Sequence, residues 1–336
     1  MHIATPERLS VVCVVLAMLA VAPDARALDF KKYPALRSFA GDMAEKHGFS
    51  VAKLRQVFRC ATIRPDIIEA MERPRELLAW HEYRKIFVTE DNARRGARFW
   101  KEHAGDIARA QEHYGVPPEI ILAIIGVESR YGRSKGGYPV LDALATLTLE
   151  YPPRSEFFRK ELEEFLLLAR EIDVNPCEVK GSYAGAMGLP QFMPSSYRRL
   201  AVDFDGDGRR DLLDNPADTI GSIAHYLRHN GWEAGAPTIA EVKLEGTLYF
   251  WVEKLGIKPA LSVRQLAEYG IFPRQLDNPE RRAALISLEG EYGPFHRLGF
   301  NNFYVITRYN LSKRYAMAVV ELGEMIRRYR EENSPT

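Results

Sequence analysis

The residue best placed for chemistry is Glu128, near the C-terminal end of the apolar segment Val116–Gly132 (VPPEIILAIIGVESRYG). This segment is predicted to be a helix that begins at the proline pair and ends at the last glycine. Three isoleucines share the helical stripe of the glutamate: Ile121, Ile124 and Ile125. A carboxyl group among them is desolvated, which raises its pKa and lets it hold a proton near neutral pH. Glu128 is therefore a candidate general acid. Alternatively, Glu128 forms an ion pair with Arg130 or Arg133, or marks the point where the helix emerges into water.

A second unusual segment, Gly181–Tyr197 (GSYAGAMGLPQFMPSSY), consists largely of small residues in its first half. Glycine and alanine let the backbone approach another backbone or a ligand closely. Ser182 and Gln191 are neutral hydrogen-bonding residues at either end of this small-residue run. The segment is either a face that binds a polar ligand or a tightly packed contact between helices.

Aspartates recur at positions 1, 3, 5, 9 and 12 of the loop Asp203–Asp214 (DFDGDGRRDLLD), with Gly208 at position 6. This spacing is that of the EF-hand calcium loop, apart from Asp in place of Glu at position 12. The predicted ligands are the aspartates and the backbone carbonyl of Arg209: Asp203, Asp205, Asp207, Arg209, Asp211 and Asp214. Asp218 is a candidate for the closing ligand if Asp214 is too short to reach the ion. An acidic, glycine-rich turn without a metal is the alternative.

The length and composition are those of a globular protein. The chain has 336 residues, of which 46% are hydrophobic and 27% charged, and its formal net charge is +1. That charge argues against a nucleic-acid-binding protein. No segment after the first 27 residues is long and apolar enough to span a membrane.

Residues 1–27 are predicted to be a signal peptide that is removed on export. A positive start at Arg8 precedes the apolar run Leu9–Ala22, and a small-x-small cleavage site ends at Ala27. Cys13 lies inside the apolar run instead of following a small residue at its end, so lipidation is not expected. The mature chain keeps Cys60 and Cys177, and the sequence leaves open whether they pair in an oxidising compartment.

Helical periodicity covers most of the mature chain. Helices are expected within residues 30–115 and over Val140–Leu149, Ser155–Arg170, Thr219–Asn230 and Ser312–Arg330. Strands are expected at Leu244–Val252 and Ala284–Leu288, in a small mixed section.

Together these segments resemble the MltB-type (family 3) lytic murein transglycosylases. The resemblance rests on GVESRYG at 126–132, on Gly181–Tyr197 and on the aspartate loop, and it continues through GSIAHYLRHNGW at 221–232 and ITRYN at 306–310. It implies a mainly α (α+β) fold with a lysozyme-like catalytic core. The implied parts are a helical N-terminal lobe (28–115), the core with its EF-hand-type loop (116–237), a small mixed α/β section (238–302), and a C-terminal strand and helix that return to the core (303–336).

The resemblance implies cleavage of the β-1,4 bond between N-acetylmuramic acid and N-acetylglucosamine in peptidoglycan, without water and with a 1,6-anhydro product. Glu128 would then act as the single acid and base, and Ser182 would help to position the acetamido group or the intermediate. The residues expected to line the sugar cleft are Tyr83, Arg154, Gln191, Phe192, Tyr226, Tyr309, Asn310 and Tyr315. Calcium would be structural, with no organic cofactor.

The implied setting is the periplasm, with glycan strands of peptidoglycan as the substrate and other cell-wall enzymes as candidate partners. One alternative is a hydrolytic muramidase on the same fold. Another is a calcium-stabilised peptidoglycan-binding protein without catalysis.

Overall fold

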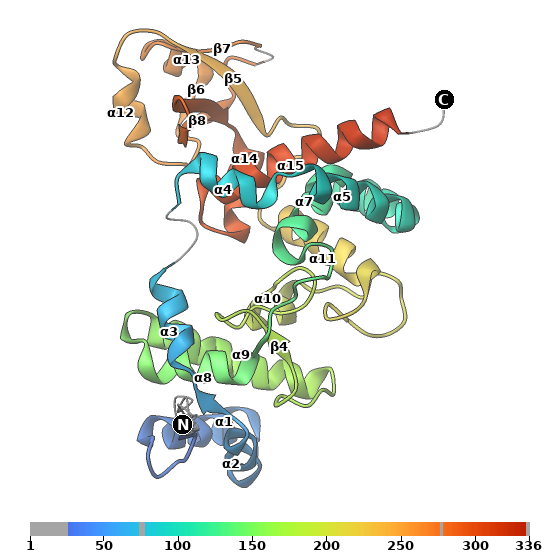
Figure 1. Cartoon of the computed structure of the whole chain (residues 1–336), viewed down its shortest axis with the longest axis vertical. Helices are drawn as coiled ribbons and strands as arrows, with labels where there is room; N and C mark the ends of the chain where they lie inside the picture. The colour runs from blue at the N-terminus through green and yellow to red at the C-terminus, as the bar shows by residue number, and fades with distance from the viewer. Residues whose placement is uncertain (1–25, 74–77, 276–277, 334–336) are drawn as a thin grey trace, which may run out of the picture.

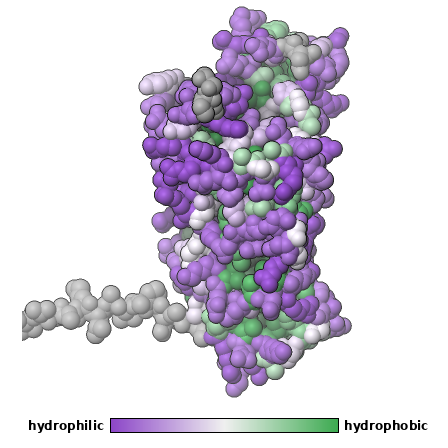
Figure 2. Space-filling model, turned by 90° about the vertical axis from the view of Figure 1, so that its right-hand side faces the viewer, coloured by the Kyte–Doolittle hydropathy of each residue, from purple (hydrophilic) through white to green (hydrophobic). Residues whose placement is uncertain are grey.

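The structure is a computed structural model that describes residues 26–73, 78–275 and 278–333. The predicted signal peptide lies outside these residues, except for Arg26–Ala27, which form the short strand β1. The molecule is elongated, with the N-terminal helices at one end and a five-stranded sheet at the other (Figure 1). Hydrophilic residues cover most of the face in Figure 2, and apolar residues gather toward the end that carries the N-terminal helices. Among the helices described here, none is long and apolar enough to cross a membrane.

The core at the N-terminal end is built by helices. They are α1 (Pro34–His47), α2 (Val51–Arg59), α3 (Pro65–Glu72), α8 (Val140–Glu150), α9 (Ser155–Glu171) and α10 (Pro194–Leu200). Their apolar residues recur at three- and four-residue spacing, as Leu36, Phe39, Ala40 and Met43 do on α1. A short 3₁₀ turn, Pro152–Arg154, joins α8 to α9.

A second core lies in the middle of the molecule. Its helices are α4 (Trp80–Phe87), α5 (Glu90–Glu102), α6 (Ala104–Tyr114), α7 (Pro118–Ser129), α11 (Pro216–His229), α14 (Asn301–Tyr309) and α15 (Lys313–Glu332). Residues 28–115, expected as one helical lobe, therefore divide between two cores, because α1–α3 pack on the first and α4–α6 on the second. Tyr226 and Tyr309 contact both cores and so mark their junction.

Covalent and polar contacts hold the N-terminal helices to α8 and to the loop after α9. Cys60 at the end of α2 forms a disulfide with Cys177, which settles the question that the sequence left open. The buried carboxylate of Asp142 on α8 accepts hydrogen bonds from the backbone N–H and the hydroxyl of Thr62, at 3.1 and 3.0 Å. Thr62 belongs to β2 (Thr62–Ile63), which pairs with β1 in antiparallel register.

The sheet at the other end is antiparallel, with strand order β6-β8-β9-β5-β7. Its strands are β5 (Ile239–Leu244), β6 (Leu261–Ser262), β7 (Ile271–Pro273), β8 (Arg282–Gly290) and β9 (Gly293–Gly299). Two short helices, α12 (Tyr249–Glu253) and α13 (Val263–Ala267), pack on the sheet to form a third core. The expected strand at Ala284–Leu288 lies within β8.

Two expected strands are wrong. Leu244–Val252 is not a strand, because β5 ends at Leu244 and Gly246 turns the chain with a left-handed φ of +68° before α12 begins. In the C-terminal segment that was expected to contain a strand, residues 301–309 form helix α14, whose buried Phe303 and Ile306 are three residues apart as a helix requires.

Breaking the disulfide is expected to destabilise the chain, because the bond restricts a long loop in the unfolded state. Cys60→Ser is predicted to lower the free energy of unfolding by about 2–5 kcal/mol. Urea denaturation with and without a reductant measures this loss of stability. The double variant Cys60→Ser with Cys177→Ser is the control, and its denaturation midpoint should be the same with and without the reductant. Equal denaturation midpoints for the oxidised and reduced chains would contradict the prediction.

Candidate active site

Helix α7 carries Glu128 through the second core. Pro118 occupies its first turn, where a missing N–H costs nothing, and the residues from Ile120 to Val127 are all buried. The helix ends at Ser129, earlier than the predicted Gly132, because Arg130 and Tyr131 adopt left-handed φ angles of 51° and 58°. The Ser129 hydroxyl then accepts a hydrogen bond from the backbone N–H of Gly132 at 3.1 Å. Non-glycine residues in this conformation are strained, and such strain gathers at functional sites.

Glu128 is half-buried and receives a hydrogen bond from a neutral group. The hydroxyl of Tyr315, on α15, donates to Oε1 of Glu128 at 2.6 Å. Tyr315 is 2% exposed, so water has little access to this bond. The carboxyl group is therefore held in a fixed direction by a donor that carries no charge.

Aromatic rings continue from this hydrogen bond. The rings of Tyr309 and Tyr315 are stacked, with centroids 6.2 Å apart, and Tyr309 lies 4.8 Å from the ring of Tyr226. Phe192, from the small-residue segment, contacts Tyr226 at 5.4 Å and Tyr309 at 5.7 Å. The small-residue segment and helices α11, α14 and α15 thus bring together with Glu128 four of the residues that the sequence predicted for a sugar cleft.

The tyrosines of this cluster remain neutral near pH 7. Burial raises the pKa of Tyr226 to about 12, and the charge of Glu128 adds to the shift. Burial, with Glu128 as the next cause, also holds the pKa values of Tyr309 and Tyr315 well above their usual range. Among the described residues, Glu128 is the one carboxylate whose charge raises the pKa of Tyr226 and Tyr309.

The segment Gly181–Tyr197 is a compact loop followed by α10, and its Gly185 packs closely on Leu144 of α8. Strand β4 (Lys180–Gly181) pairs with β3 (Tyr138–Pro139), and Met187 forms bridges to Gly181 and to Phe192. The Ser182 hydroxyl oxygen accepts from the backbone N–H groups of Ala184 and Ala186, at 3.2 and 3.0 Å. These two bonds fix the oxygen and leave its proton to be donated.

Gln191 joins this loop to the turn after α7. Its side-chain amide nitrogen donates to the backbone carbonyls of Gly188 at 2.8 Å and of Lys135 at 3.1 Å. Gln191 itself has a left-handed φ of 49°. Because both amide hydrogens are used, the side-chain oxygen is the group left to face a ligand.

The remaining predicted cleft residues differ in position. Tyr83 is 2% exposed on α4, its ring centre lies 5.0 Å from that of Phe87, and it is close enough to Tyr315 to raise the pKa of Tyr315. Asn310 follows α14 directly after Tyr309. Arg154 lies in the exposed turn between α8 and α9, with its guanidinium 4.3 Å from the ring of Phe157, so its described contacts do not reach the tyrosine cluster.

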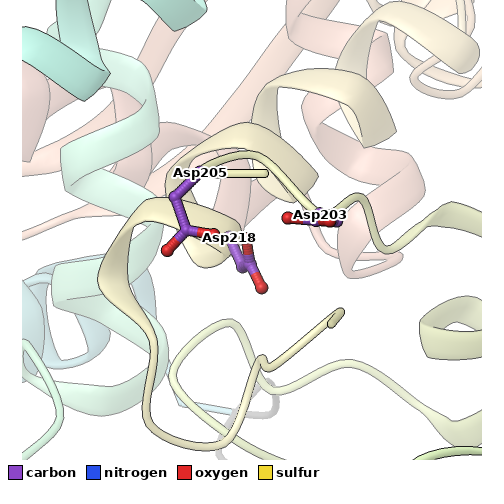
Figure 3. A group of neighbouring side chains, drawn as sticks. All are labelled: Asp203, Asp205 and Asp218. Atoms are coloured by element: carbon purple, nitrogen blue, oxygen red, sulfur yellow. The ribbon is translucent and has the colours of Figure 1, made fainter. Parts of the chain in front are cut away.

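Three carboxylates of the acidic loop converge. Asp203, Asp205 and Asp218 each offer an oxygen within 4.8 Å of the others (Figure 3). Both oxygens of Asp218 accept backbone N–H bonds at 2.7 Å, from Phe204 and from Asp211, which fixes its place at the start of α11. Burial raises the pKa of Asp218, and the charges of Asp205 and Asp203 raise it further. Such repulsion between like charges is what a bound cation relieves.

The other predicted ligands cap the turns of the loop. Asp207 accepts from the backbone N–H of Arg209, and Asp211 accepts from those of Leu213 and Asp214. The side chain of Asp214 forms an ion pair with Lys135 at 2.5 Å, outside the convergent group. Asp218, in contrast, belongs to that group.

Comparison with known proteins identifies the family. A family model described as the transglycosylase SLT domain matches residues 31–324. The chain belongs to this family. It is 42% identical over 310 residues to the membrane-bound lytic murein transglycosylase B of Escherichia coli strain K12, across 89% of this chain and 84% of the relative.

Solved structures support the same membership of the SLT transglycosylases. The catenated lytic transglycosylase SltB1 from Pseudomonas aeruginosa has a TM-score of 0.84 and 44% identity, over 90% of this chain and 100% of that chain. The Escherichia coli lytic transglycosylase Slt35 in complex with calcium has a TM-score of 0.83 and 41% identity, over 91% of this chain and 97% of that chain.

Two further residues of this SLT transglycosylase support the site without a sequence pattern that predicts their role. The backbone carbonyl of Lys135 accepts a hydrogen bond from the side chain of Gln191. Its ammonium group donates to the side chain of Asp214 and to the backbone carbonyl of Leu213. Lys135 therefore links the turn after α7 to the acidic loop. Asn215 caps α11 and donates to Asp205 at 2.8 Å. The Asn215-Pro216 pair is a recognisable start of a helix, whereas a single lysine in a glycine-rich turn carries no pattern.

Proposed function

We propose that this chain is a peptidoglycan lytic transglycosylase that cleaves the bond between N-acetylmuramic acid and N-acetylglucosamine, with Glu128 as both acid and base. Membership of the SLT family and the name of the Escherichia coli relative support the substrate class. The observation that carries the role of Glu128 is its half-buried carboxyl group on α7, held at 2.6 Å by the Tyr315 hydroxyl.

The reaction needs one proton donor that becomes a proton acceptor. Protonated Glu128 gives its proton to the glycosidic oxygen as the bond from that oxygen to C1 of the muramic acid breaks. The resulting carboxylate then accepts the proton of the C6 hydroxyl, whose oxygen forms a new bond to C1. No water enters, and Glu128 ends protonated as it began.

The hydrogen bond from Tyr315 to Glu128 supports this use of one carboxyl group. Most glycosidases use two carboxylates, one on each side of the sugar. Here Glu128 is the one described carboxylate whose charge raises the pKa of both Tyr226 and Tyr309. A tyrosine hydroxyl donates a hydrogen bond without fixing the carboxyl group in its charged form, as an arginine would.

Positioning falls to the loop and the aromatic residues. The Ser182 proton and the Gln191 side-chain oxygen are the hydrogen-bonding groups that the loop leaves for the acetamido and hydroxyl groups of the sugar. Tyr226, Tyr309 and Asn310 would line the sugar-binding site, with the buried Tyr83, Phe192 and Tyr315 behind them. Arg154 would then meet a more distant part of the substrate, such as a stem peptide.

We further propose that the acidic loop binds calcium in a structural role. Calcium prefers oxygen ligands, and Asp203, Asp205 and Asp218 supply convergent ones. Asp207, Asp211 and the carbonyl of Arg209 are the further predicted ligands, whereas Asp214 pairs with Lys135. The related Slt35 was solved in complex with calcium, which supports this choice of metal.

The expected location is the periplasm. The predicted signal peptide directs export, and cleavage near Ala27 would leave the described chain nearly whole. Peptidoglycan, the proposed substrate, is found in the same compartment, and other cell-wall enzymes there are candidate partners.

Glu128→Gln is expected to lower the rate of peptidoglycan cleavage by about 10²–10⁴-fold, because the amide neither gives nor accepts the proton. Mass spectrometry of the soluble products checks both rate and chemistry, since anhydromuropeptides are lighter than hydrolysis products by one water. Glu119→Gln, at the other end of α7, is the matched control and should leave the rate unchanged. Reducing-end products would point to a hydrolytic muramidase, and glycan binding without products to a binding protein.

Tyr315→Phe is expected to lower kcat by about tenfold or more while changing KM little, because it frees the carboxyl group from its fixed direction. Steady-state rates on purified peptidoglycan test this. Tyr292→Phe is the control, because Tyr292 is 98% exposed. An unchanged kcat in Tyr315→Phe would show that the hydrogen bond does not position Glu128.

Calcium is expected to raise the melting temperature, by an amount that grows with concentration and corresponds to about 2.7 kcal/mol at a hundredfold excess over Kd. Thermal unfolding with calcium and with a chelator measures the shift. Asp205→Asn should lose it, whereas Asp106→Asn, in the ion pair with Arg109, should keep it. Asp214→Asn should keep most of it, because Asp214 pairs with Lys135. A wild-type melting temperature that ignores calcium would refute the site.

A further inference from the structure

The short helix α12 and its flanks expose a cluster of large apolar side chains. Leu248, Phe250, Trp251 and Leu255 are 54%, 50%, 63% and 53% exposed, and we call these residues the α12 patch. Helix α12 lies on the outer edge of the sheet end of the molecule, away from the helices of the second core (Figure 1). Large exposed apolar clusters mark surfaces that are covered by something else.

The other side of α12 is firmly attached to the sheet. Val252 is 2% exposed in the third core, and Tyr249 packs against the same core. Glu253, the one acid of this helix, turns inward and accepts hydrogen bonds from the Ser287 hydroxyl and from His296, the latter at 3.2 Å. The patch is thus the outward face of an anchored helix, and its acid points away from that face.

Positive charge borders the patch. The ammonium group of Lys254 lies 4.3 Å from the ring centre of Trp251. Lys258 follows shortly after Leu255 and is also exposed. Within the described part of the chain, neither lysine has an acidic partner, so both charges are available to an external anion.

From this arrangement we propose that the α12 patch binds the surface of a membrane that contains anionic phospholipids. Tryptophan and lysine beside leucine and phenylalanine are the side chains that settle at the lipid–water boundary. The rings and leucines would enter the acyl region, while Lys254 and Lys258 would contact the phosphates. The proposal needs no catalytic step and stands apart from the proposed transglycosylase activity.

Trp251 provides a direct probe of this contact. The other three tryptophans, Trp80, Trp100 and Trp232, are 3%, 8% and 2% exposed, and the predicted signal peptide contains none. On addition of vesicles of phosphatidylcholine mixed with phosphatidylglycerol, the full chain should show a blue shift of tryptophan emission and quenching by brominated lipids. Vesicles of phosphatidylcholine alone should give a smaller response.

Two double variants separate the contributions. Phe250→Ser with Leu255→Ser should weaken vesicle binding by more than about tenfold through lost apolar burial. Lys254→Gln with Lys258→Gln should weaken it by roughly tenfold, and only for the anionic vesicles. Tyr292→Ser removes an exposed aromatic residue elsewhere and should bind like the wild type, and circular dichroism should show that each variant is folded.

Several results would overturn the proposal. One is vesicle binding without any change in Trp251 emission, which would assign the binding to another part of the chain, such as the signal peptide. Another is equal binding by the α12 variants and by Tyr292→Ser. A third is capture of a protein by the patch while vesicles stay unbound, which would make this face a protein interface.

Discussion

The structure depends on the hydrogen bond between a carboxyl group at the end of an apolar helix, that of Glu128, and the neutral hydroxyl of Tyr315. Helix α7 is buried along nearly its whole length, so Glu128 is largely cut off from water on one side. A partly buried carboxyl group without a hydrogen-bond partner would be costly. The Tyr315 hydroxyl, neutral because burial raises its pKa, satisfies the carboxyl group in a way that is compatible with both of its protonation states. Helix α15 packs along α7, and this packing brings Tyr315 to Glu128.

The acidic loop reaches the active site through backbone contacts. The N–H of Leu189 donates to the carbonyl of Leu212 at 2.9 Å, which ties the small-residue segment to the end of the loop. A methyl group on Gly188 would come 2.1 Å from that carbonyl, so a glycine is required at this point of closest approach. Asp218 fixes the start of α11, the helix that carries Tyr226. A cation that orders the acidic loop would therefore also order the segment around Gln191 and the start of α11. The metal would take no part in the chemistry.

Local patterns in the sequence predicted the parts of the site but not their assembly. The apolar helix with Glu128, the small-residue segment and the aspartate loop were all recognisable from spacing, because each is a property of adjacent residues. The division of residues 28–115 between two cores is not recognisable from spacing, because it depends on long-range contacts such as that between Thr62 and Asp142. The end of α7 at Ser129 was missed because Arg130 and Tyr131 adopt a conformation that normally favours glycine. The link through Lys135 depends on folded geometry alone.

The wrong strand at Leu244–Val252 and the exposed α12 patch have one cause. The stretch contains more large apolar residues than the third core can bury, and such density is typical of a strand with both faces covered. In the structure the chain turns at Gly246, which ends the strand. Of the apolar residues on the short helix that follows, Tyr249 and Val252 pack on the third core. The surplus, which includes Phe250 and Trp251, then has to face outward. Packing on the sheet explains the inward position of Tyr249 and Val252, and the proposed contact with a membrane surface would explain why the residues that face outward are apolar.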